Sequence, residues 1–197
     1  MLYRFPFFTR AYTRRSLFQL FMVCAFPIHV WTILMAFRDF SWVAERTNTW
    51  DAVGLLSYAM VFAFFETFGM FLILVLTGLF MPKGWSAEKR LGLLGVLYLI
   101  LAVWAILIQS YSLNGYPLPG WVAKFLVESG HPLRLMWGGM FLVTALTVTV
   151  PVILLVRSEK AQRASIEIFD RLAILSSFYL LFDVVGAVVL VVRNIRA

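Results

Sequence analysis

The sequence predicts an all-α polytopic membrane protein, a bundle of five transmembrane helices with a short interfacial helix at its outer side. Two observations lead to this fold class. Hydrophobic residues make up 62% of the 197-residue chain and the mean hydropathy is +0.88, whereas roughly 45–50% apolar residues is usual in soluble domains. In addition, several apolar stretches are each long enough to cross about 30 Å of hydrocarbon.

Five apolar stretches are the predicted spans. Because a backbone in hydrocarbon must satisfy its own hydrogen bonds, we expect each stretch to be a helix. The second stretch has 30 residues, which predicts a tilted or protruding helix. No polar stretch is long enough to fold as a soluble domain, so residues 1–197 form a single transmembrane domain. The predicted spans are 16–37, 52–81, 91–111, 135–156 and 172–192.

Two of the connecting segments carry helix signals. Pro119 can begin a helix and Gly130 can end it, and Trp121, Phe125 and Leu126 give it an apolar face. This pattern predicts an interfacial helix over residues 119–129. In residues 157–171, acidic residues precede arginines by four positions, which is typical of an exposed helix, here a cytoplasmic one.

The lysines and arginines predict the orientation. With the N-terminus cytoplasmic, eleven of them lie inside and six outside, as the positive-inside rule requires. We therefore expect a multi-pass protein of the cell membrane (plasma or inner), with its C-terminus outside. The same distribution explains the net charge of +7 without nucleic acid, so the predicted partners are the lipid bilayer and other membrane subunits. The six outer residues are Arg38, Arg46, Lys124, Arg134, Arg193 and Arg196.

Two acidic residues, Glu66 and Asp183, lie near the centres of the second and fifth spans. A charged side chain at the centre of a membrane helix costs about 2.5–3.5 kcal/mol on insertion scales, so each is a candidate functional residue. His29 in the first span lies at a similar depth. No lysine or arginine shares this level, so the acids are protonated, share a proton or bind a cation.

Further polar residues recur at helical spacing around these three. Small and polar residues turn inward in membrane bundles, so we expect Glu66 and Asp183 to face the interior at similar depth and to share a site. The alternative is that each polar group only holds helices together. The predicted ligand or proton site comprises Glu66, Asp183, His29, Tyr179, Ser176, Thr144 and Thr147.

Catalytic and cofactor motifs are absent from the sequence. Cys24 is the only cysteine, which excludes an intrachain disulfide, and neither a phosphate-binding glycine loop nor a metalloprotease motif occurs. The spacing predicts no metal site. A bound lipid, quinone or pigment would suit the 17% aromatic content, but no motif indicates one and the cofactor stays unknown.

Three functions are compatible with these observations. The first is a non-catalytic subunit or interaction partner within a larger membrane assembly. The second is a small transporter or proton- or cation-conducting protein that uses Glu66 and Asp183. The third is an enzyme for a lipid-like substrate, with Glu128 and His131 as polar candidates at the outer mouth; the missing motifs make an enzyme the least favoured.

Overall fold

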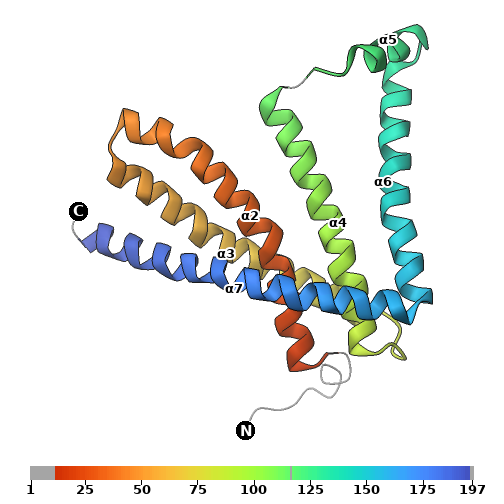
Figure 1. The fold of residues 1–197 in the computed structure, drawn as a ribbon, viewed down its shortest axis with the longest axis horizontal. Helices are drawn as coiled ribbons and strands as arrows, with labels where there is room; N and C mark the ends of the chain where they lie inside the picture. The colour runs from red at the N-terminus through yellow and green to blue at the C-terminus, as the bar shows by residue number, and fades with distance from the viewer. Residues whose placement is uncertain (1–11, 116, 196–197) are drawn as a thin grey trace.

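The computed structural model describes residues 12–115 and 117–195, and within them every element is a helix (Figure 1). All of the helices except α5 are long and apolar enough to cross a membrane. The predicted all-α, multi-pass membrane fold is therefore confirmed. The helices are α2 (Arg14–Arg46), α3 (Thr49–Leu79), α4 (Ala87–Asn114), α5 (Gly120–Glu128), α6 (Pro132–Arg157) and α7 (Glu159–Ile195).

Most helices continue beyond their apolar stretches because capping residues fix where they begin and end. Thr13 and Ser16 form a reciprocal capping box at the start of α2, and the side chain of Asn48 accepts from the backbone N–H of Asp51 at the start of α3. Such caps satisfy the free N–H groups of the first turn. Only Thr47 and Asn48 therefore separate α2 from α3.

The two helical connections predicted from the sequence are present. Helix α5 covers most of the predicted segment, and Gly130 follows with a φ of 70°, a left-handed conformation that favours glycine. Residues 159–171 form the first part of α7, which is separated from the end of α6 by Ser158 alone. The Glu159–Arg163 ion pair forms at 3.7 Å. The interfacial position of α5 and the cytoplasmic position of residues 157–171 stay predictions.

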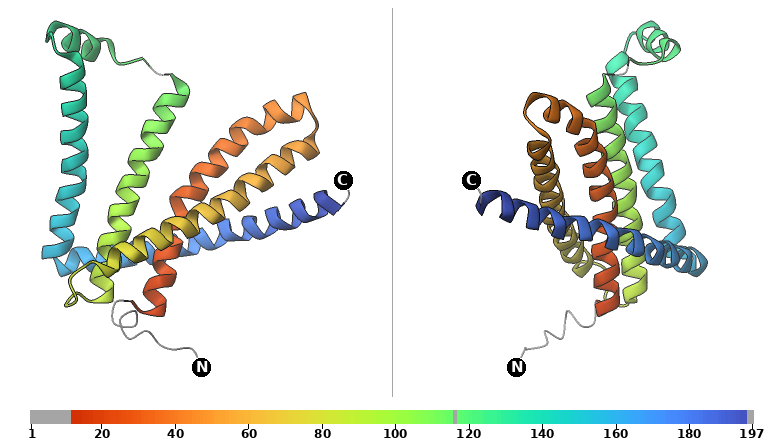
Figure 2. Two further views of the ribbon diagram at one scale, coloured as in Figure 1. Left: turned by 180° about the vertical axis from the view of Figure 1, so that it is seen from behind. Right: turned by 60° about the vertical axis from the view of Figure 1, so that its left-hand side comes forward.

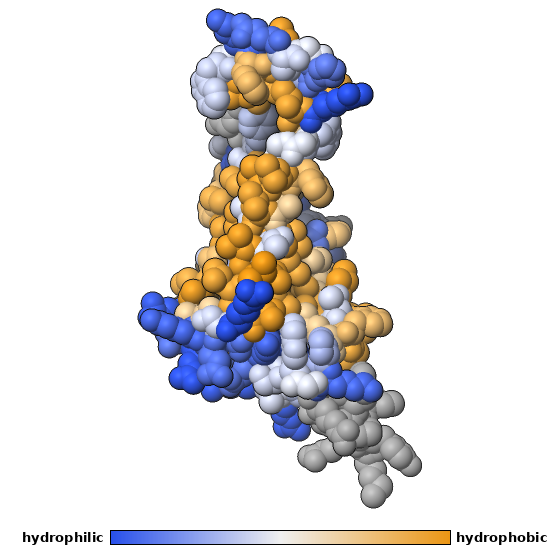
Figure 3. Space-filling view, turned by 90° about the vertical axis from the view of Figure 1, so that its right-hand side faces the viewer, coloured by the Kyte–Doolittle hydropathy of each residue, from blue (hydrophilic) through white to orange (hydrophobic). Residues whose placement is uncertain are grey.

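The helices form two arms that meet at one end and part towards the other (Figures 1 and 2). Helices α2, α3 and α7 pack together, and we call them the three-helix arm. Helices α4 and α6 lean away from α2 and form the second arm, with α5 over the far end of α6. In the most apolar 18-residue stretch of α2, 44% is buried inside the protein, whereas in that of α6 only 6% is buried. Figure 3 shows the resulting apolar surface between two polar ends.

The hydrophobic core lies where the two arms meet. It joins the first half of α2 to the end of α3, the start of α4 and the early turns of α7. Phe169 is 1% exposed, and a Cβ at Gly95 would lie 2.5 Å from its ring, so α4 and α7 touch closely here. The core residues are Tyr12, Leu20, Val23, Cys24, Leu74, Val75, Leu91, Leu94, Tyr98 and Phe169.

Arg90 fixes the turn between α3 and α4 from a buried position. Its guanidinium donates to the carbonyl oxygens of Gly78 at 2.8 Å, Pro82 at 2.7 Å and Trp85 at 3.3 Å. A cation is favourable at a helix C-terminus, where the carbonyls lack intrahelical partners. Nearby, outside the spans, burial raises the pKa of the Tyr12 phenol, and the charge of Arg90 opposes that rise.

Candidate functional site

The structure pairs Asp183 with His29 inside the three-helix arm. The imidazole Nε2 lies 3.1 Å from Oδ1 and 3.0 Å from Oδ2 of the carboxylate. His29 is 0% exposed and Asp183 is 6% exposed. The pair therefore ties α2 to α7 in a largely solvent-free setting.

The hydrogen bonds around His29 fix how many protons the pair holds. Nδ1 lies 2.8 Å from the carbonyl oxygen of Ala25, which can only accept, so Nδ1 carries a hydrogen. The contact between Nε2 and Asp183 needs one more proton, either on the imidazole or on the carboxyl group. His29 and Asp183 thus share a single proton, which removes the cost of burying an isolated charge.

Neighbouring residues of α7 complete the contact with α2 and α3. Ser176 is fully buried and donates to the carbonyl oxygen of Met22 at 2.7 Å, and the Tyr179 ring stacks on His29 with centroids 6.2 Å apart. A Cβ at Gly186 would lie 3.1 Å from the carbonyl oxygen of Ser57. Ser176, Tyr179, Asp183 and Gly186 therefore all lie on the side of α7 that packs against α2 and α3.

Near Pro27, backbone carbonyls of α2 accept hydrogen bonds from side chains of α4 and α7 and from His29 of α2 itself. Proline has no N–H, so it interrupts the helix ladder and bends the helix, and Figure 1 shows α2 curving along its length. Tyr98 of α4 donates to the carbonyl oxygen of Cys24 at 3.0 Å. Ser176 donates to the carbonyl oxygen of Met22, and His29 donates to that of Ala25. The neighbouring helices thus stabilise this irregular turn.

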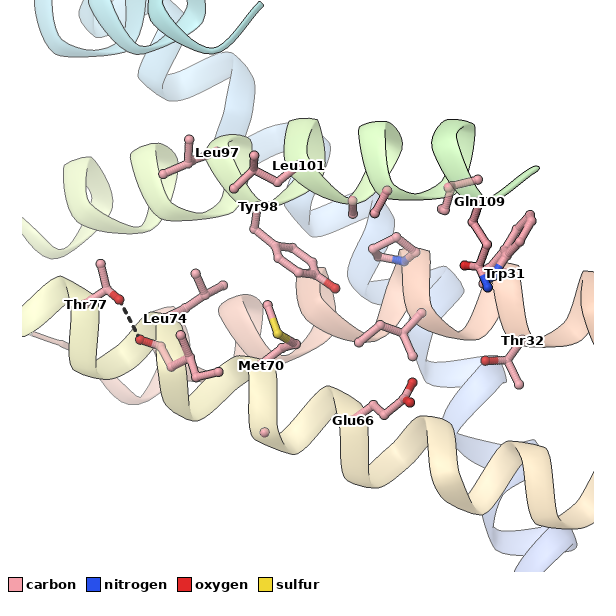
Figure 4. Close-up of a pocket in the computed structure, with 17 residues that line it drawn as sticks. Trp31, Thr32, Glu66, Met70, Leu74, Thr77, Leu97, Tyr98, Leu101 and Gln109 are labelled. Atoms are coloured by element: carbon pink, nitrogen blue, oxygen red, sulfur yellow. Dashed lines mark hydrogen bonds between the residues drawn. The ribbon is translucent and has the colours of Figure 1, made fainter. Parts of the chain in front are cut away.

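A cleft of about 810 Å³ lies between α2, α3 and α4, where the two arms part (Figure 4). Its walls are mainly aliphatic and aromatic side chains. The polar residues among them are few, and none of the described residues that line it is basic. They are Trp31, Thr32, Glu66, Thr77, Tyr98 and Gln109.

Glu66 is the acidic group of this cleft. It lies near the middle of α3 and is exposed, and Figure 4 shows its side chain reaching from α3 into the cleft. Within the described residues, its carboxylate has neither a hydrogen bond nor an ion pair. Thr77, one of the few other oxygens, donates to the carbonyl of its own helix at Ile73.

Glu66 and Asp183 occupy two different sites, and α2 lies between them. Successive residues of a helix are turned by about 100°. Ile28 and Thr32 line the cleft, while His29 between them is buried against Asp183. The structure therefore brings His29, Ser176, Tyr179 and Asp183 together and leaves Glu66 in the cleft. The direct contact between Glu66 and Asp183 that a shared site would allow is not formed.

The remaining predicted residues take part in local contacts. Thr147 accepts from the indole N–H of Trp104 at 3.0 Å and donates to the carbonyl of Thr144 at 2.9 Å, which links α6 to α4. Glu128 pairs with Lys124 at 3.8 Å on exposed α5. His131 lies at the exposed start of α6, near the Ser129 carbonyl. Neither Glu128 nor His131 lines the cleft.

The sequence interpretation missed the α4 wall of the cleft. Tyr98, Leu101, Ala105 and Gln109 recur at intervals of three and four residues, the spacing of one helix face. The glutamine within an apolar helix was a usable signal for that face. Within the described residues, no group of three or more histidine, cysteine, aspartate or glutamate side chains is placed to hold a metal ion.

Comparison of the chain with protein-family models, with curated proteins and with solved structures finds no match. The fold alone defines the class, an all-α multi-pass membrane protein. Any more specific role must be argued from the cleft and the buried pair.

Proposed function

We propose that this chain is a small membrane transport protein whose cationic substrate meets Glu66 in the cleft. The observation that carries the proposal is an exposed mid-helix carboxylate, without a partner among the described residues, on the wall of a cleft of about 810 Å³. Ionisable groups within membrane segments commonly mark substrate or ion pathways because they are costly to keep there. The paired Asp183 has a structural role instead.

Flux through reconstituted protein tests this function. Proteoliposomes are prepared with an outward gradient of protons, of sodium ions or of the fluorescent organic cation ethidium. The efflux of each cation is then followed separately. We expect Glu66→Gln to reduce the flux of at least one cation tenfold or more. The matched control is Glu128→Gln, which neutralises an exposed carboxylate outside the cleft. Equal flux in wild type, Glu66→Gln and empty liposomes for all three cations would contradict the proposal.

The second candidate is the subunit of a larger membrane assembly, and α6 favours it. Gly138 and Gly139 lie side by side on this nearly unburied helix, and a Cβ at either would meet nothing within 4 Å. Small residues are where membrane helices approach closely. The assembly would be supported by a membrane protein that copurifies in fixed ratio with the wild type but not with Gly139→Leu. If the purified monomer shows full cation flux, the assembly is not required for transport.

The proposed orientation places residues 157–171 in the cytoplasm and the α4–α6 connection outside, so the arms part outwards. Of the charges behind it, Arg4, Arg10 and Arg196 lie outside the described residues. Single cysteines at Ser158 and Ser129 test it in intact cells with an impermeant thiol reagent, since native Cys24 is buried. We expect labelling at position 129 only; labelling at 158 from outside reverses the orientation.

A further inference from the structure

The size and lining of the cleft define what kind of molecule fits it. Ligand sites typically measure about 300–1,000 Å³ and are mostly apolar with a few placed polar groups. The cleft, at about 810 Å³, falls within this range. An apolar molecule of moderate size with one polar end matches such a lining.

Glu66 determines the chemistry of the polar end. Its carboxylate lacks a partner within the described chain, and none of the described lining residues is basic. An ammonium group would donate charge-assisted hydrogen bonds to it, which are roughly twice as strong as neutral ones. A carboxylate or phosphate ligand would bring a second negative group to an acid that has no basic neighbour in the lining.

An inorganic cation fits the cleft less well than an organic one. Calcium takes six to eight oxygen ligands, and magnesium requires near-octahedral coordination. Besides Glu66, the lining offers few side-chain oxygens, those of Thr32, Thr77, Tyr98 and Gln109. The apolar walls instead favour a cation that carries its own hydrocarbon.

The α3 wall sets the position of that hydrocarbon. Between Glu66 and Thr77 the cleft is lined by Gly69, Met70, Ile73 and Leu74, an apolar strip about 16 Å long at 1.5 Å per residue. At Gly69, one turn from the acid, a Cβ would meet nothing within 4 Å. Open space therefore lies directly beside the carboxylate.

We propose that the cleft binds a lipophilic amine, with its ammonium group on Glu66 and its hydrocarbon chain along the strip past Gly69. This inference rests on the proposed function, because it names the substrate class of the same site. It is more specific than cation transport, since it requires both the charge and the apolar body.

Native mass spectrometry of the protein in zwitterionic nanodiscs tests the inference with three probes that share one tail: dodecylamine, dodecanol and dodecanoate. We expect one bound dodecylamine and at least tenfold weaker binding of the other two. Glu66→Gln should weaken dodecylamine binding at least tenfold, and Gly69→Leu should also weaken it by filling the space for the chain. The control Glu128→Gln should bind as the wild type does. Thermal unfolding verifies that each variant is folded.

The two experiments distinguish a failure of the proposed ligand from a failure of the proposed function. Amine binding that depends on Glu66, without cation flux, supports the inference and contradicts transport. Glu66-dependent flux of protons or sodium, without amine binding, supports transport and overturns the inference. Equal binding of dodecylamine and dodecanol, or unchanged binding in Glu66→Gln, also overturns it. So does a partner protein whose lysine crosslinks to Glu66 and is not displaced by dodecylamine.

Discussion

Asp183 and Glu66 are both acids near the centres of membrane helices, but the protein treats them in opposite ways. Asp183 is 6% exposed and shares a proton with a fully buried histidine. Glu66 is exposed in a cleft and has no partner within the described chain. The three-helix arm encloses its acid, while the parting of the two arms leaves the other acid accessible. The arrangement of the helices, rather than the residue type, therefore separates a buried, paired acid from an exposed one.

The largest expected difference is the stability cost of removing each acid. Asp183→Ala leaves His29 buried without its partner and should lower the free energy of unfolding by about 3–5 kcal/mol. Glu66→Ala removes no hydrogen bond or ion pair within the described residues and should change it by less than about 0.5 kcal/mol. Unfolding of both variants by SDS titration in mixed micelles gives the comparison.

A double variant verifies the reason for that difference. Replacing both members of a buried pair by apolar residues is often neutral, so His29→Leu with Asp183→Leu should recover most of the stability that Asp183→Ala loses. If Glu66→Ala is as destabilising as Asp183→Ala, Glu66 has a structural role and the contrast between the two acids is lost.

The glycines of the two regions give an intermediate effect. Gly95→Ala places a methyl group against the Phe169 ring and should cost about 1–3 kcal/mol through overpacking. Gly69→Ala adds a methyl group to open space in the cleft and should be neutral or stabilising, because alanine favours a helix. Thermal unfolding measures both, and a similar loss in both variants would argue against an open cleft.

The smallest expected effect concerns the contact between α4 and α6. Thr147→Val removes the acceptor of the Trp104 indole and should cost about 0.6 kcal/mol, the average for hydrogen bonds between membrane helices. Ser177→Ala is the control, since Ser177 donates only within its own helix, to Ala173. A loss above about 2 kcal/mol at Thr147 would mean that this single bond holds the second arm in place.

The sequence was sufficient to predict the five spans, the short α5 and the inward direction of Asp183, Ser176 and His29. These properties depend on hydropathy and on helical spacing, which are local. It was not sufficient to predict that Asp183 pairs with His29 rather than with Glu66. The sequence predicts a similar depth for all three. Which helices are neighbours, and how each is rotated, depends on packing between distant segments.

The contacts of Arg90 also could not be predicted from the sequence. A charge at the end of an apolar stretch indicates topology, and the charge pattern predicted no other role for Arg90. Only the fold places the end of α3 around its guanidinium. The cleft also depends on tertiary structure, because it exists where α4 diverges from α2, and no local pattern encodes that divergence.

The hydrogen bonds around Pro27 also have a consequence for how the protein is made. Helix α2 is synthesised before α7, yet the partners of His29 and of the Met22 carbonyl belong to α7, each 154 residues further along the chain. During synthesis the imidazole of His29 therefore stays without its acidic partner until α7 is translated. A chain that stops before α7 keeps a histidine in α2 without its acidic partner.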